Sequence, residues 1–157
     1  MMAGVLPWIG PTMSARSIDD VETITVLGAG SMGHGIAQLA AFAGYEINLR
    51  DIERDLVENG YEQIEWSIQK LTEADKVTEA EGAEALARIE TYVDLEDALA
   101  DADVVIEVVP EKMDLKKDVY AEVTAHAPDD AVFMTNTSTL SITELSEATD
   151  RPEQFCG

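Results

Sequence analysis

The chain has 157 residues, 46% of them hydrophobic, and its 10 basic and 32 acidic residues give a net charge of −22 at pH 7. The apolar residues are numerous and segmented, which excludes an acidic disordered chain and suffices for one domain with a sizeable core. The charge predicts a solvated surface of the halophilic kind and excludes nucleic acids and anionic membranes as partners, and no apolar run approaches the roughly 20 residues of a membrane span.

The stretch before Val21 is expected to lie outside the fold. Residues 1–12 have no charged leader and a Pro-interrupted apolar run, so they make a poor signal peptide. A start codon assigned too far upstream or a disordered extension would explain them. We therefore expect residues 1–20 to be an extension and residues 21–157 to be one folded domain.

Strand and helix patterns alternate from Val21 onward. A β-branched run predicts a strand over Thr23–Leu27, and the small-residue helix after it ends at Gly44. "YEINLRD" predicts a second strand. Apolar residues at helical spacing then predict a long helix over 57–71, and 79–86 is expected to form a shorter one.

The second half of the chain continues the alternation. A weak strand is expected over 89–92, a buried central strand over 103–109 and a further strand over 131–137, with a helix at 115–123 between the last two. Ser141 and Glu144 form a predicted capping box, and "QFCG" is the sixth candidate strand. Six alternating strands predict an α/β fold with a doubly wound, Rossmann-type parallel sheet in a single domain.

A glycine-rich turn between the first strand and its helix is the first candidate site. Glycines at this spacing permit a tight turn, a close approach of backbone to a pyrophosphate, and close packing of helix on strand. The helix N-terminus offers free N–H groups to the phosphates. The residues expected to bind the cofactor here are Gly28, Ala29, Gly30, Ser31, Met32 and Gly33.

Asp51 is the candidate ribose ligand, because it ends the second strand 23 positions after Gly28. A carboxylate there accepts hydrogen bonds from ribose hydroxyls and repels a 2′-phosphate, so NAD is favoured over NADP. Arg50 and Arg54 flank it and could soften that preference. The alternative is that Asp51 only caps the helix that follows.

Longer stretches carry a family resemblance. From "VLGAGSMGHGIAQLAAFAGYEINLRD" the chain resembles the NAD-binding domain of 3-hydroxyacyl-CoA dehydrogenases, although this stretch alone would also suit 3-hydroxyacid dehydrogenases of the 6-phosphogluconate dehydrogenase type. "ADVVIEVVPEKMDLKKDVY" and "TNTSTLSITELSEATDRPEQFCG" are similar to the first family, and the second of them is specific to it. The resemblance covers residues 21–157 and implies a cytoplasmic, NAD-linked, reversible oxidation of a 3-hydroxyacyl-CoA in fatty acid metabolism.

The resemblance also implies roles for single residues. Glu111 and Lys116 would line the nicotinamide side of the cofactor, unless they are only a surface ion pair. Ser138 would be catalytic, bonding the 3-oxygen of the substrate and touching the cofactor. Asn136 would shape the turn and belong to the cofactor-binding residues. Ser67 would meet the CoA moiety, although the lysine that accompanies it in relatives has no clear counterpart. Two departures are Thr139 for a second serine and Val108 for an alanine.

The family's catalytic histidine, the glutamate that orients it and a helical dimerising domain would all follow Gly157. His34 and His126 are expected to be structural or solvated, and Cys156 a small buried hydrophobe in a reducing cytosol. No metal site is expected. Two alternatives stay open: a stand-alone NAD-binding module and a 3-hydroxyacid dehydrogenase that acts on a free acid.

Overall fold

The computed structural model describes residues 17–157, so the expectation for residues 1–12 lies outside the described part. Within it the strands form one parallel sheet in the order β3-β2-β1-β4-β5-β6. The strands are β1 (Thr23–Leu27), β2 (Glu46–Arg50), β3 (Ile89–Tyr92), β4 (Val104–Glu107), β5 (Val132–Thr135) and β6 (Phe155–Cys156). The predicted fold class and all six predicted strands are confirmed.

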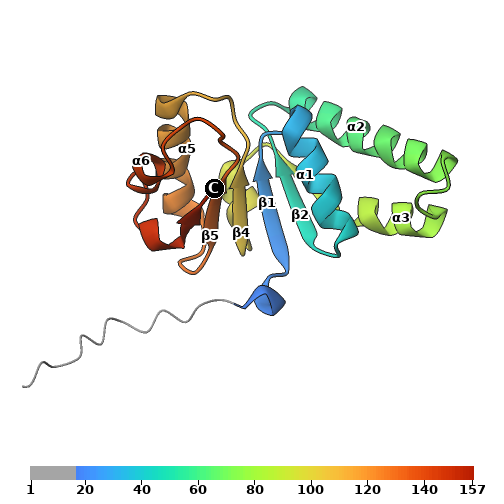
Figure 1. The fold of residues 1–157 in the computed structure, drawn as a ribbon, viewed down its shortest axis with the longest axis horizontal. Coiled ribbons are helices and arrows are strands. Elements are labelled where there is room, and N and C mark those ends of the chain that lie inside the picture. Colours follow the sequence, from blue (N-terminus) through green and yellow to red (C-terminus); the bar gives the residue numbers. More distant parts are fainter. Residues whose placement is uncertain (1–16) are drawn as a thin grey trace, which may run out of the picture.

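Helices cover both faces of the sheet. Figure 1 shows α1, α2 and α3 together on one side, and α5 with α6 on the other. The helices are α1 (Ser31–Phe42), α2 (Arg54–Glu73), α3 (Glu79–Ala87), α4 (Leu95–Leu99), α5 (Met113–His126) and α6 (Ile142–Ser146), with 3₁₀ turns η1 (Ile18–Asp20) and η2 (Pro152–Gln154). None of the helices in residues 17–157 is long and apolar enough to cross a membrane.

Strand β1 lies at the centre of the sheet, and all five of its residues are buried. One apolar cluster packs β1 and β2 against α1, α2 and α3, and a second packs the other face against α4 and α5. The strand order reverses direction between β1 and β4. In open parallel sheets a ligand crevice forms at such a switch point, outside the carboxyl ends of the strands.

Helix α4 was not predicted from the sequence. It has five residues, too few for a periodic pattern, and the side chain of Asp94 caps it by accepting from the Asp97 N–H at 3.1 Å. Buried polar side chains then tie it to the sheet. Thr25 Oγ1 and Asn48 Nδ2 donate to the Ala98 carbonyl at 2.7 and 3.0 Å.

Two sequence interpretations near the C-terminus need correction. Ser141 does cap α6, accepting from the Glu144 N–H at 3.2 Å, but the Glu144 carboxylate pairs with Lys117 Nζ of α5 at 2.5 Å instead of completing a capping box. Cys156 is exposed rather than buried, because β6 lies at the edge of the sheet.

Candidate functional site

The turn between β1 and α1 has a shape that only glycine permits at two positions. Gly28 has φ +108°, and a Cβ there would lie 2.7 Å from the Val108 carbonyl oxygen of the neighbouring strand end. A Cβ on Gly33 would lie 1.7 Å from the Gly28 oxygen. Both contacts are with backbone, which cannot rotate away, so the turn sits tightly against β4 and under α1.

Gly30 is placed differently, because a Cβ on it would meet no atom of the described residues within 4 Å. Gly30 is the N-cap of α1 and has no side chain with which to cap the helix. The first N–H groups of a helix lack partners within the helix and attract anions. The open space before Gly30 and the uncapped helix end are therefore suited to a phosphate group.

Asp51 anchors this turn and does not cap α2. Its Oδ2 accepts from the Ala29 N–H at 2.8 Å, and its Oδ1 accepts from the Ile52 N–H at 2.7 Å. The N-cap of α2 is Glu53. Arg50 Nε donates to the Val93 carbonyl at 2.9 Å, which holds that guanidinium by β3.

A pocket of about 600 Å³ opens at the carboxyl edge of the sheet, over the switch point. Its lining combines the glycine-rich turn after β1, Asp51 directly after β2, and the loops after β4 and β5. The predicted site residues that line it are Gly28, Gly30, Ser31, Met32, Asp51, Glu111 and Asn136. The structure thus brings together residues that are up to 108 positions apart in the sequence.

Exposed apolar side chains make up much of the remaining wall. Met32, Ile52, Leu56 and Leu115 line the pocket and are between 37% and 65% exposed. Apolar side chains open to solvent at a pocket are suited to the faces of a flat ring. Only Met32 among them was predicted from the sequence, and Ile52, Leu56 and Leu115 were missed because nothing in their local sequence marks them as part of a pocket.

Glu111 ties the loop after β4 to the loop after β5. It accepts hydrogen bonds from the Thr137 hydroxyl and, at 3.2 Å, from Thr139 Oγ1. The bond from Thr137 is the main cause that holds the pKa of the Glu111 carboxyl below its usual value, and Lys116 acts in the same direction. Thr139, noted as a departure from the family, therefore has a contact of its own.

Lys116 lies one layer behind the pocket wall. Its side chain is fully buried, with Nζ 2.6 Å from Glu107 Oε1 and 3.5 Å from Glu111 Oε2. The surface ion pair is thus excluded for Lys116, and its nearer partner is Glu107. Glu107 was missed because one acid within the apolar run "VVIEVV" does not change the pattern of a buried strand.

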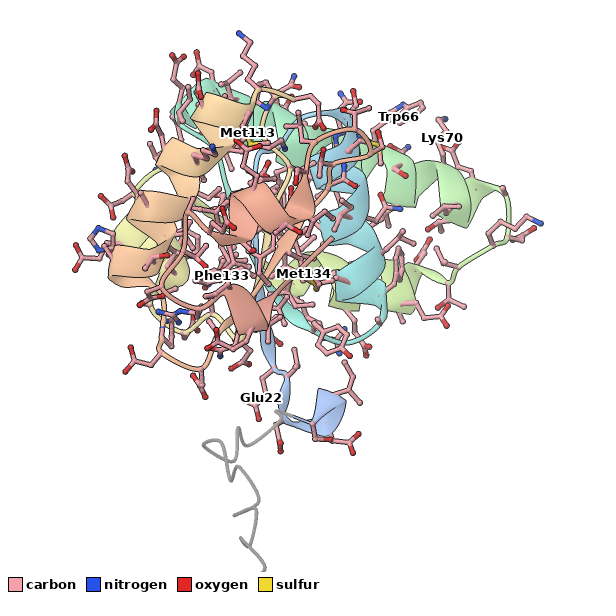
Figure 2. The ribbon with its side chains drawn as sticks, turned by 60° about the vertical axis from the view of Figure 1, so that its left-hand side comes forward. Glu22, Trp66, Lys70, Met113, Phe133 and Met134 are labelled. Carbon is pink, nitrogen blue, oxygen red and sulfur yellow. The ribbon has the colours of Figure 1, made fainter. Side chains whose placement is uncertain are left out.

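The other predicted residues lie around the pocket. Ser138 is exposed on the loop between β5 and α6, two residues after the pocket-lining Asn136. Ser67 is half-buried on α2, where its neighbour Trp66 and the nearby Lys70 lie on the outer side of the helix (Figure 2). Ser67 is outside the set of described residues that line the pocket.

The two histidines of the chain also lie outside the pocket lining. His34 stands in the first turn of α1, and His126 ends α5 with its Nδ1 3.9 Å from Glu96 Oε2.

A dinucleotide fits this arrangement. The uncapped helix end and the open space at Gly30 match a pyrophosphate, and Asp51 at the end of β2 matches a ribose hydroxyl pair. The exposed apolar side chains of the pocket wall are suited to the face of a flat ring of the cofactor. The close packing of α2 on the glycine-rich turn also requires glycine at position 60, which was not predicted from the sequence. A Cβ added to Gly60 would lie 2.6 Å from the Ala29 oxygen.

The chain is similar to known dehydrogenases over most of its length. Residues 23–157 match the family model described as 3-hydroxyacyl-CoA dehydrogenase, NAD binding domain. A 3-hydroxybutyryl-CoA dehydrogenase of Bradyrhizobium diazoefficiens is 39% identical over 137 residues, which cover 87% of this chain and 46% of that protein. A fatty acid oxidation complex subunit alpha of Idiomarina loihiensis is 40% identical over 138 residues, which cover 88% of this chain and 19% of that protein.

A solved structure shows the same backbone. The (S)-3-hydroxybutyryl-CoA dehydrogenase from Ralstonia eutropha superimposes with a TM-score of 0.83 at 36% identity, over 86% of this chain and 47% of that one. The chain thus spans less than half the length of these relatives. Since the family model matches from the first strand to the last residue, the chain belongs to the 3-hydroxyacyl-CoA dehydrogenase family as an NAD-binding domain.

Proposed function

We propose that this chain is the cofactor-binding part of an enzyme that reversibly oxidises a 3-hydroxyacyl-CoA to the 3-oxoacyl-CoA. The observation that carries the proposal is a single pocket. The glycine-rich turn with open space at Gly30, the carboxylate of Asp51, and the side chains of Glu111 and Asn136 all line it. When bound there, NAD supplies the hydride acceptor. The residues of this chain bind it, orient it and shape the place where the substrate meets it.

Each residue has a distinct proposed role. The turn from Gly28 to Gly33 holds the pyrophosphate with backbone N–H groups, and Asp51 accepts from the adenosine ribose. Glu111 and Asn136 lie at the nicotinamide half, with Lys116 behind Glu111. Ser138 donates a hydrogen bond to the 3-oxygen of the substrate, and Ser67 contacts the CoA moiety.

The general base is proposed to come from outside these 157 residues. His34 in the first turn of α1 and His126, which faces Glu96, both lie outside the pocket lining. General-base assistance contributes typically about 10²–10⁴-fold to a rate. The isolated chain should therefore bind NADH but turn over very slowly.

Several finer features belong to the same proposal. The enzyme acts in the cytoplasm, the acidic surface is an adaptation to high salt, and the longer family form is a homodimer. A 3-hydroxyacid dehydrogenase acting on free acids and a stand-alone NAD-binding module are the rival functions. The first differs in substrate, and the second in having no turnover in any form.

A fusion experiment tests the proposal. The chain is compared with a fusion that appends the C-terminal half of the Ralstonia relative after Gly157, using 3-hydroxybutyryl-CoA and free 3-hydroxybutyrate as substrates. The fusion should gain activity on the thioester alone, and Ser138→Ala within it should lower kcat with little change in NADH affinity. Preference for the free acid would favour the first rival, and absence of turnover in a folded, NADH-binding fusion would favour the second.

A further inference from the structure

A buried ion pair between Glu107 and Lys116 lies at the end of β4. The proposed function assigns no role to Glu107 and places Lys116 only behind Glu111. The side chains of Glu107 and Lys116 are both 0% exposed, with Nζ 2.6 Å from Oε1. Two charges taken out of water are costly unless their other hydrogen-bonding groups are also satisfied. Here Glu107 Oε2 accepts from Thr135 Oγ1 of β5 at 2.8 Å, so the cluster joins β4, β5 and α5.

The pair holds the backbone of Val109 from both sides. The Val109 N–H donates to Glu107 Oε1 at 2.7 Å, and the Val109 carbonyl accepts from Lys116 Nζ at 3.1 Å. Lys116 Nζ also lies 3.5 Å from Glu111 Oε2. Val109 and Glu111 both line the pocket. The buried charges therefore fix the orientation of a wall segment and of the carboxylate beside it.

This wall lies across the switch point from Asp51. Asp51 follows β2, Glu107 ends β4, and β1 lies between these two strands in the sheet. A dinucleotide with its adenosine ribose at Asp51 and its pyrophosphate at the turn after β1 extends its other half over β4. The segment held by the ion pair thus faces the nicotinamide half and not the adenosine half.

We propose that Glu107 is a positioning residue that acts through Lys116 and the Val109 peptide to shape the pocket wall for the nicotinamide half of NAD. The inference rests on the proposed function, because it requires the dinucleotide in this orientation. The competing explanation is that the pair only holds β4, β5 and α5 together. The two differ in one respect: a positioning pair affects one half of the ligand, whereas a stabilising pair affects folding alone.

Binding of NADH and of ADP to the folded chain separates the two explanations. ADP keeps the adenosine and the pyrophosphate but lacks the nicotinamide ribose and ring. For Glu107→Gln we expect the NADH Kd to rise about tenfold, the order expected when a hydrogen bond to a charged group is lost. The ADP Kd should change by less than about twofold, which corresponds to about 0.4 kcal/mol. Calorimetry measures the first, and an NMR titration the second.

Two further variants keep the test decisive. Glu107→Gln removes the nearer charged partner of the buried Lys116 and can lose stability outright. The double variant Glu107→Gln/Lys116→Met removes both charges at similar volume, and circular dichroism and a thermal melt establish that it is folded. Glu144→Gln is the matched control, since Glu144 pairs at 2.5 Å with Lys117, the residue after Lys116, outside the pocket lining.

The readout is the ratio of NADH to ADP affinity. A ratio that falls at least about fivefold in the folded double variant, roughly 1 kcal/mol, but not in Glu144→Gln supports the positioning role. A lower melting temperature with an unchanged ratio would overturn it and leave a structural pair. If the unmodified chain binds neither ligand, the proposed function itself fails, and the inference loses its basis with it.

Discussion

The same substitution, glycine to alanine, should have opposite effects at two helical positions of this domain. Alanine is favoured over glycine by about 1 kcal/mol within a helix. At Gly35 of α1 an added Cβ meets no described atom within 4 Å, so Gly35→Ala should raise the free energy of unfolding by about that amount. The melting temperature should then rise by roughly 2–4 °C for a domain of this size.

At Gly60 of α2 the added Cβ would lie 2.6 Å from both the Cβ and the carbonyl oxygen of Ala29. Carbon atoms in contact prefer about 3.5–4.0 Å, so helix and turn must separate by about 1 Å. Overpacking of this kind costs about 1–3 kcal/mol, and the helical preference for alanine offsets about 1 kcal/mol of it. We expect a net loss of up to about 2 kcal/mol and a melting temperature up to roughly 8 °C lower.

The assay reports on function as well. Because Ala29 belongs to the glycine-rich turn proposed to bind the pyrophosphate and its N–H donates to Asp51, Gly60→Ala should also raise the NADH Kd, whereas Gly35→Ala should leave it unchanged. Thermal melts followed by circular dichroism, together with NADH fluorescence titrations, measure both quantities. Equal stabilisation by the two variants would refute the close approach of α2 to the turn.

Three further predictions concern charge. Wild type should bind NADH more tightly than NADPH in fluorescence titrations at equal salt, and Asp51→Ser should narrow the gap; equal or tighter NADPH binding by wild type would contradict the ribose role. Thr137→Val should raise the pKa of Glu111 in a carboxyl NMR titration, since the Thr137 hydroxyl is the main cause of its lowered pKa. A carboxyl with a lowered pKa stabilises the folded state above its unfolded-state pKa, and this contribution disappears as the pH falls through its folded-state pKa. The loss of folding stability caused by Thr137→Val should therefore be present at neutral pH and vanish in acid. With a net charge of −22, the melting temperature should rise from low to molar KCl as self-repulsion is screened, and a flat or falling curve would argue against adaptation to salt.

The features that the sequence predicted well are those in which backbone conformation restricts the residue type. At Gly28 and Gly33 a Cβ would lie too close to backbone atoms, so both positions require glycine and the spacing of the two glycines located the turn. The β-branched run of β1 and the apolar run of β4 likewise indicated strands that are largely buried. Asp51 could be found because its distance from the turn is set by one helix and one strand.

The features that were missed depend on contacts between segments far apart in the chain. Gly60 looks like an ordinary helix glycine until α2 is packed against Ala29. Helix α4 is held by Thr25 and Asn48, which lie on β1 and β2, and its own five residues carry no period. Ile52 lies between two acidic residues in the sequence, and its exposed apolar side chain is explained only by its position in the wall of the pocket.

Glu107 differs from these cases, because the residues that accompany its burial form a pattern that can be recognised in a sequence. A central parallel strand covered on both faces offers no solvent to a carboxylate at its last residue, so that acid needs a cation and hydrogen-bond donors from the next elements. The following helix begins at the same edge of the sheet, and Lys116, nine positions after Glu107, lies in its first turns. The next strand supplies Thr135 opposite the acid. An acid that ends such a strand, with a lysine early in the next helix and a hydroxyl at the end of the next strand, therefore predicts a buried cluster behind the pocket wall.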